Sequence, residues 1–160
     1  MKFRHELTYD ASPAEVFEML ADPAFREASA AAMGVVSAEV DLTRTGDGFS
    51  LTIDQVQLTD DLPSFARTFA GQTTRAIQRE EWADPTGATL RIETPGKPAE
   101  MKGTITLRAD GAGTCEVVEL DVRVKMPLIG GKLEKLMAAK VEAGLVAEQG
   151  AGTAWLAGER

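Results

Sequence analysis

The stretch "PLIGGKLEKLMAAKVEAGLV", residues 127–146, decides the fold, because it follows a long series of strand-like segments with a helical one. Its apolar side chains recur at helical spacing and form one face: Leu133, Leu136, Met137, Val141 and Leu145. Charged residues such as Lys132 and Glu142 lie mainly on the other faces. We therefore predict a long amphipathic helix that covers an apolar surface formed by the rest of the chain.

The segments before this helix alternate between apolar and polar residues, as half-buried antiparallel strands do. In "EMKGTITLR", residues 100–108, Met101 and Ile105 share one side with Leu107. The stretch "TCEVVELDVRVKM", residues 114–126, repeats the pattern with Val118 and Val122. Turn residues such as glycine, proline and aspartate separate these segments. About six strands are therefore expected between the N-terminal region and the last helix.

The N-terminal region predicts one more strand, followed by two short helices. Ser12 and Glu15 have the spacing of a capping box, and Pro13 suits the first turn of a helix. Pro23 ends that helix and begins a second one, which runs to about Ala32. The strand before them has four side chains on one face: Phe3, His5, Leu7 and Tyr9.

This order of elements predicts an α+β protein, because the strands are grouped apart from the helices. One face of the strands is apolar, so the sheet needs cover on one side only, and the C-terminal helix is the one element long enough to provide it. A twisted sheet curved around one helix leaves a gap between the two. A small-molecule pocket would lie in that gap.

Three stretches resemble the START-like, or SRPBCC, superfamily: "SPAEVFEMLADPAF" after the first strand, the strands ending at Met126, and "PLIGGKLEKLM" opening the last helix. The resemblance spans nearly the whole chain. It implies the helix-grip fold, a curved antiparallel sheet of about seven strands with a long C-terminal helix across its concave face. The superfamily includes lipid-transfer START domains, polyketide cyclases and aromatases, and the birch-pollen allergen. The C-terminal region further resembles an actinobacterial branch with no assigned activity.

The composition sets limits on partners and location. The chain has 160 residues, 44% hydrophobic and 26% charged, so we expect one domain with one core. The resemblance implies that residues 1–160 form a single START-like ligand-binding domain. The net charge of −8 argues against nucleic acid and against stable anchoring to an anionic membrane. No apolar run approaches the ~20 residues of a membrane span, and the N-terminus has no signal-peptide core. We expect a cytoplasmic location; nothing in the sequence indicates the oligomeric state.

The sequence has no recognisable metal or cofactor motif. His5 is the one histidine and Cys115 the one cysteine, which leaves no ligand set of a familiar type. We therefore expect no metal dependence and no cofactor. Cys115 has no nucleophile motif around it, so we assign no catalytic residue.

The shared phase of the inward positions predicts the lining of the pocket. We expect it to consist of Phe3, His5, Leu51, Ile105, Val122, Met137, Val141, Gly144 and Leu145. His5 could meet a ligand or act as a general base. The favoured interpretation is a histidine bonded to backbone beneath the end of the helix.

The phase of the strand "TTRAIQREEW", residues 73–82, is open in the sequence. If Ile77 points inward, Arg75 and Arg79 do too. If Ala76 and Trp82 point inward, Gln78 and Glu80 join them. We favour arginines on the outer face, because burying unpaired charges is costly. The pairs Asp60–Asp61 and Glu80–Glu81 are predicted to be surface charge.

Two irregularities in the pattern carry further predictions. The apolar alternation shifts by one position after Ile53, which predicts a bulge near Asp54–Gln55. Within the last helix, Gly144 and Gly152 fall on the inward stripe, where a missing side chain allows close approach or leaves room for a ligand. Gly150 falls outside that stripe. We expect the helix to continue past Gly152, because Trp155 and Leu156 need cover.

The sequence leaves two main hypotheses for the function, and a third possibility remains. The first is binding or transport of an apolar small molecule such as a lipid, a fatty acid or a polyketide-like compound. The second is a cyclase- or aromatase-type enzyme acting on such a ligand, for which His5, Tyr9 and an inward arginine are the candidate polar groups. The third is a non-catalytic interaction module whose cavity is filled by side chains.

Overall fold

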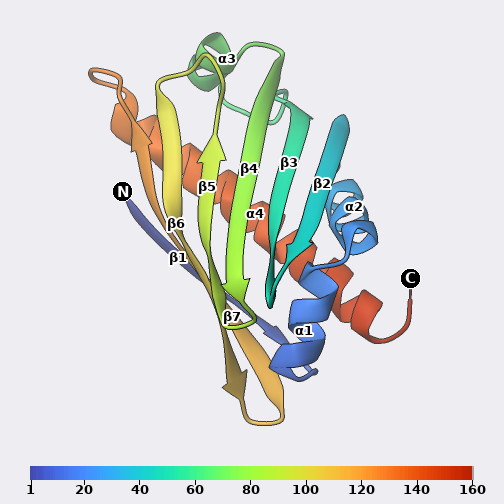
Figure 1. Cartoon of the computed structure of the whole chain (residues 1–160). Helices are drawn as coiled ribbons and strands as arrows, with labels where there is room; N and C mark the ends of the chain where they lie inside the picture. Colours follow the sequence, from blue (N-terminus) through green and yellow to red (C-terminus); the bar gives the residue numbers. More distant parts are fainter. Residues whose placement is uncertain (160) are drawn as a thin grey trace.

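The computed structural model describes residues 1–159 and shows an α+β helix-grip fold, as the sequence predicts (Figure 1). A seven-stranded sheet in the order β1-β7-β6-β5-β4-β3-β2 pairs antiparallel throughout. The elements in chain order are β1 (Lys2–Tyr9), α1 (Pro13–Leu20), α2 (Pro23–Ala32), β2 (Ser37–Thr45), β3 (Gly48–Leu58), α3 (Ser64–Ala70), β4 (Thr73–Asp84), β5 (Gly87–Glu93), β6 (Ala99–Asp110), β7 (Gly113–Val124) and α4 (Gly130–Leu156).

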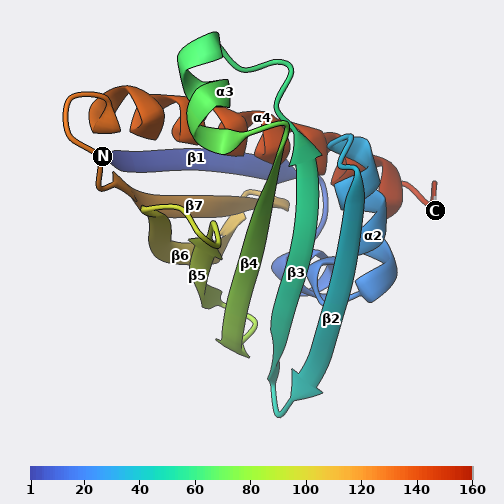
Figure 2. The same ribbon diagram turned by 90° about the horizontal axis from the view of Figure 1, so that it is seen from above.

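The sheet curves around one side of α4, so that different strands lie at different distances from the helix (Figure 2). β1 and β7 are the strands in closest contact with α4. α1 and α2 pack against the C-terminal half of α4, and α3 lies near its N-terminal half (Figures 1 and 2). The space between α4 and the central strands is therefore bounded by helices at both ends.

The two short helices begin as the sequence predicts. The backbone N–H of Glu15 donates to Ser12 Oγ at 3.2 Å, and that of Ser12 donates to Glu15 Oε1 at 3.3 Å, which completes the capping box. The N–H of Ala24 donates to Asp22 Oδ1 at 2.9 Å at the start of α2. These caps fix where the chain turns from β1 toward the end of the sheet.

The bulge predicted near Asp54–Gln55 is wrong. β3 pairs with β2 and β4 without a shift of register along this stretch, so Gln55 and Gln57 stay on the concave side and Val56 on the convex side. The register shift lies instead between Trp82 and Asp84, where β4 pairs with β5. The apolar pattern changes phase in β3 because the concave face becomes polar, while the backbone alternation continues.

Aromatic side chains fill the end of the concave face that α1 and α2 cover. Phe49 and Trp82 stack with ring centroids 5.3 Å apart, and Phe17 meets Phe49 at 5.5 Å. Phe25 of α2 meets Trp155 of α4 edge-on at 5.6 Å. This end of the molecule is a packed core, and the unfilled space lies along the rest of α4.

Candidate functional site

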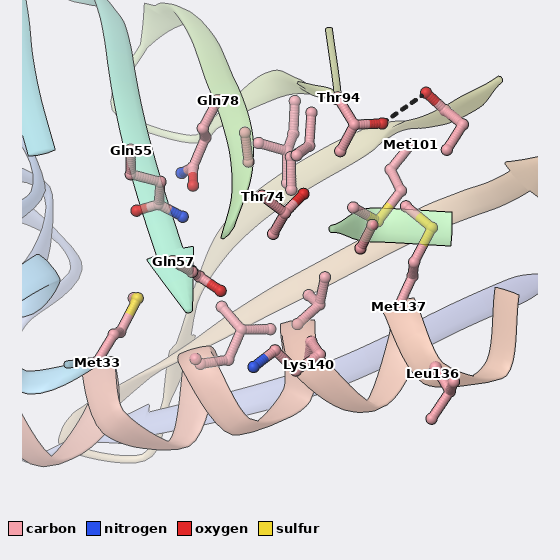
Figure 3. Close-up of a pocket in the computed structure, with 18 of the residues that line it drawn as sticks. Met33, Gln55, Gln57, Thr74, Gln78, Thr94, Met101, Leu136, Met137 and Lys140 are labelled. Atoms are coloured by element: carbon pink, nitrogen blue, oxygen red, sulfur yellow. Dashed lines mark hydrogen bonds between the residues drawn. The ribbon is translucent and has the colours of Figure 1, made fainter. Parts of the chain in front are cut away.

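A cavity of about 190 Å³ lies between α4 and the concave face of the sheet (Figure 3). α4 forms one wall with side chains such as Met137, Val141 and Leu145. Strands β3 to β7 form the opposite wall, which includes Met101 and Ile105. α3 adds Ala66 and Phe69, and Met33 follows α2. The walls are mainly apolar, as expected of a site that takes an apolar ligand.

The strands and the residue after β5 also turn a row of neutral polar side chains toward the helix: Gln55, Gln57, Thr74, Gln78 and Thr94 (Figure 3). Thr94 Oγ1 donates to the carbonyl oxygen of Ala99 at 3.1 Å, so it is engaged locally. Gln78 Nε2 donates to Glu80 Oε1 at 2.7 Å. Amide groups of this kind can orient a polar group on a ligand without the cost of burying a charge.

Two lysines line the cavity, and both are engaged by neighbours. Lys140 Nζ donates to Asp61 Oδ2 at 2.9 Å, in a pair whose side chains are partly exposed. Lys97 Nζ donates to the carbonyl oxygen of Phe69 at 2.8 Å. Both ammonium groups are therefore already engaged by neighbouring groups.

A buried ion pair borders the cavity at the end covered by α2. Arg26 Nη1 and Nη2 donate to the two oxygens of Glu80 at 3.1 and 2.7 Å, and its Nε donates to the carbonyl of Leu20 at 2.7 Å. Glu80 also accepts from Trp82 Nε1 at 2.8 Å. The two charged side chains are 3% and 1% exposed. Such a pair is favourable only when its remaining hydrogen-bonding groups are satisfied, as they are here.

The position of Glu80 resolves the phase of β4 and corrects one prediction. Ala76, Gln78 and Glu80 line the cavity, while Arg75 lies outside and pairs with Asp54 at 2.6 Å. The arginines are therefore on the outer face, as favoured. Asp60, Asp61 and Glu81 are exposed as predicted, but the assignment of Glu80 to the surface is wrong. Arg26, from a distant helix, provides the counter-charge that makes its burial tolerable.

Two further carboxyl groups, Glu116 of β7 and Glu148 of α4, line the cavity beside this pair. Their side chains are almost completely buried. Burial, followed by the charge of Glu148, raises the pKa of Glu116 well above its usual value. Burial also raises the pKa of Glu148 to about 7, against the opposing charge of Arg26. Both groups thus hold their protons more tightly than an exposed glutamate does.

The same corner holds two buried oxygens without a hydrogen-bond partner among the described residues: Glu116 Oε2 and the hydroxyl of Tyr9. Burial raises the pKa of Tyr9, and the charges of Glu116 and Glu148 raise it further. We call Glu80, Glu116 and Glu148, together with Arg26 and Tyr9, the carboxylate cluster. It brings together side chains from β4, β7, α4, α2 and β1.

Five of the nine residues predicted for the pocket line the cavity: Ile105, Met137, Val141, Gly144 and Leu145. Four of them lie on α4, and Ile105 lies in the middle of β6. Their role in binding a ligand stays a prediction, because the lining alone identifies no ligand.

The other four predicted residues do not line the cavity. Phe3 and His5 are half-buried on β1, against which α4 packs directly, and their rings lie 6.5 Å apart. Val122 is completely buried on β7, the other strand closest to α4. Leu51 is buried in the packed core. Their inward phase is as expected, but the elements that face them leave no space there.

The glycines of α4 lie as the helical stripe predicts, and α4 continues past Gly152 to Leu156. A Cβ on Gly152 would lie 2.7 Å from Cε1 of Tyr9, whereas one on Gly150 would meet nothing within 4 Å. A Cβ on Gly144 would meet Sδ of Met33 at 3.5 Å, an ordinary contact with a flexible side chain. Close approach therefore explains Gly152, and space at the cavity explains Gly144.

Within residues 1–159, no group of three or more His, Cys, Asp or Glu side chains is arranged to hold a metal ion. In the same part of the chain, no helix is both long and apolar enough to span a bilayer.

Comparison with known proteins places this arrangement in a family and a fold. Residues 4–156 match the family described as "Protein of unknown function (DUF2505)". No curated protein matches the chain.

Solved structures with the same architecture cover nearly the whole chain. The protein TTHA0849 from Thermus thermophilus is 24% identical, with a TM-score of 0.68 over 96% of this chain and 98% of that one. A START superfamily protein from Mycobacterium smegmatis is 19% identical, with a TM-score of 0.59 over 93% and 94%. Truncated norcoclaurine synthase from Thalictrum flavum is 14% identical, with a TM-score of 0.62 over 93% and 91%. These similarities show a START-like fold.

Proposed function

Because the chain belongs to this DUF2505 family and has a START-like fold, we propose that it binds an apolar small molecule in the cavity beside α4. The ligand would be a lipid, a fatty acid or a polyketide-like compound. The observation that carries the proposal is the cavity itself, which has mainly apolar walls although the rest of the concave face is a packed core. An unfilled apolar space loses packing contacts, and a ligand would restore them.

The composition of the walls supports a ligand of irregular shape. Met33, Met101 and Met137 come from three different parts of the fold and line the space. Methionine side chains are flexible and polarisable, so they adapt to ligands of different outline. The row of glutamines and threonines on the strands would orient a polar group at one edge of the ligand.

A second candidate is acid–base catalysis on the same ligand. Glu148 lines the cavity and has a pKa of about 7, which is close to the value that suits a general acid or base at neutral pH. A similar fold occurs in norcoclaurine synthase, an enzyme by its name. Turnover of a bound compound that is lost in a Glu148→Gln variant would favour this candidate over simple binding.

Ligand binding can be tested with a neutral fluorescent probe, N-phenyl-1-naphthylamine, and two variants of one helix. Gly144→Leu places a side chain into the cavity, and we expect it to weaken probe binding at least about tenfold by occluding the site. Gly150→Leu is the matched control, because nothing lies within 4 Å of its added Cβ. Fluorescence titration measures both affinities, and thermal unfolding checks the fold.

From the sequence, Gly144→Leu is expected either to overpack the core or to abolish ligand binding. The space around Gly144 makes a large loss of stability unexpected. Equal probe affinity in the two variants, or no binding by the unmodified protein, would contradict the proposed function. The cytoplasmic location, the absence of metal dependence and the assignment of residues 1–160 to one ligand-binding domain stay predictions.

A further inference from the structure

The carboxylate cluster contains three glutamate side chains and one basic side chain. Glu80, Glu116 and Glu148 come together from three elements, and Arg26 is the one basic side chain bonded within the cluster. The lysines of the cavity are engaged elsewhere, Lys140 by Asp61 and Lys97 by the carbonyl of Phe69. Among the described residues, three buried carboxyl groups therefore share one guanidinium, and Glu116 and Glu148 form no ion pair of their own.

Arg26 forms its hydrogen bonds with other groups and acts on Glu116 and Glu148 only through its charge. Its two terminal nitrogens form a fork with Glu80, and its Nε binds the carbonyl of Leu20. Glu80 is saturated in turn by Arg26, Gln78 and Trp82. The ion pair is thus a closed unit that forms part of the wall.

Glu116 has the opposite character. Its side chain is 2% exposed and lines the cavity, yet its Oε2 atom has no partner among the described residues. Glu148 of α4 lines the same cavity and lies close enough to Glu116 for the two charges to interact. Buried acceptors of this kind normally find a donor, so an unpartnered oxygen on a side chain that lines a cavity marks a place for one.

We propose that Glu116 and Glu148 form a subsite for a protonated amine, and that the ligand of this protein is an amphiphile with an ammonium group at one end and an apolar body. This inference rests on the proposed function and specifies the chemical class of its ligand. The ammonium group donates to Glu116 Oε2 and to Glu148, while the apolar body lies against Met101, Val141 and Leu145. An amine brings both the missing donors and the missing positive charge.

Other polar head groups fit the subsite less well. A carboxylate would add a further negative charge beside three acidic side chains, which is unfavourable in a buried site. An alcohol offers one donor but no charge, so it leaves the two glutamates uncompensated. The order expected from the geometry is therefore amine first, alcohol second and carboxylate last.

The test uses three probes with the same chain length, decylamine, decanol and decanoate, titrated calorimetrically into the whole protein below their aggregation limits. At about pH 8 decylamine is charged, as a lysine side chain is, and Glu148 is mostly ionised. We expect decylamine to bind at least about tenfold more tightly than decanol. We expect this preference to shrink toward about pH 5, where Glu148 and Glu116 are protonated.

Arg26, Glu80 and Tyr9 face the same corner, so variants are needed to assign the effect. The double variant Glu116→Gln, Glu148→Gln should bind decylamine and decanol about equally. Its matched control is Glu119→Gln, Glu142→Gln, which removes two carboxylates outside the cavity from the same strand and the same helix. The net charge of the control changes by the same amount. The control should keep the full preference for the amine, because its two substitutions lie outside the cavity.

The outcomes separate the two proposals. Equal binding of decylamine and decanol by the unmodified protein would overturn the amine subsite and leave the proposed function standing. An amine preference that persists in the Glu116→Gln, Glu148→Gln protein would overturn the assignment to these residues. Binding of none of the three probes would overturn both proposals. The pH dependence of the unmodified protein decides the matter even if the double variant does not fold.

Discussion

The two halves of α4 meet the rest of the molecule in different ways. In the C-terminal half, a Cβ on Gly152 would lie 2.7 Å from Tyr9, and Trp155 packs edge-on against Phe25. Closer to the N-terminus, at Gly144, an added Cβ would touch only the flexible end of Met33, and the helix faces a cavity. One continuous helix is therefore a piece of packed core at one end and a cavity wall at the other.

This difference shows that the covering helices decide where the sheet is filled. α1 and α2 bring Phe17 and Phe25 into the space beneath the C-terminal half of α4. α3 is shorter and contributes Ala66 as its one buried residue. Glu148 lies at the junction, where packed core gives way to cavity, and the carboxylate cluster gathers there.

The largest effect is expected from breaking the ion pair at the packed end. Arg26→Ala leaves Glu80 buried without its counter-charge, and we expect the free energy of unfolding to fall by about 3–5 kcal/mol. Chemical denaturation at neutral pH measures it. Arg75→Ala is the matched control, because its pair with Asp54 lies on the outer face in solvent and should contribute little.

A comparable loss in the two arginine variants would mean that burial does not distinguish the two pairs. A near-neutral Arg26→Ala would mean that the C-terminal half of α4 and its surroundings are less tightly packed than the structure indicates.

The next effect compares two glycines of one helix. Gly152→Ala places a methyl group against the buried ring of Tyr9, and we expect a loss of about 1–3 kcal/mol from overpacking. Gly150→Ala meets nothing within 4 Å and should instead stabilise the helix by up to about 1 kcal/mol. Opposite changes in Tm would sharpen the contrast between packed and open surfaces of α4. Changes of the same sign and size would remove it.

A pH-dependent effect is expected from the titration of Glu148 at the junction. In the unfolded chain this group loses its proton near its ordinary pKa of 4.5, whereas in the folded protein it keeps the proton up to about 7. The stability that this group contributes is therefore fully present below about pH 4.5 and is lost as the pH rises to about 7. Glu148→Gln removes this loss, because the amide does not titrate.

We expect the Glu148→Gln protein to be more stable than the unmodified protein at about pH 8, by up to about 3 kcal/mol, and nearly equal to it at about pH 4.5. Unfolding curves across this pH range measure the difference. Glu142→Gln, at an exposed position of the same helix, is the control and should follow the unmodified protein at every pH. A difference that does not depend on pH would show that Glu148 is not held protonated by burial.

Most of the fold could be predicted from the sequence, because the signals that specify it are local. Alternation marks the strands, helical spacing marks α4, and the Ser12–Glu15 pair marks the start of α1. The one error in the strands, at Asp54–Gln55, arose because an inward-facing polar side chain looks the same in sequence as a shift of the backbone.

Part of the carboxylate cluster had a signal in the sequence that could have been used. Glu116 alternates in phase with Val118 and Leu120, and Glu148 lies on the same stripe of α4 as Gly144. Each is a charged residue at an inward position, as strand alternation indicates for Glu116 and helical spacing indicates for Glu148. That the two meet in one cavity is not visible in either pattern.

The sequence by itself determined which residues point toward the inside, because side-chain direction follows from the local geometry of each strand and helix. Only the tertiary structure decided which of those residues face a cavity and which face a packed core. That choice depends on how closely α4 approaches the sheet, which is set by side chains from α1, α2 and α3. Likewise, Glu80 is buried because Arg26 reaches it across 54 positions of the chain, and no local pattern can specify such a pairing.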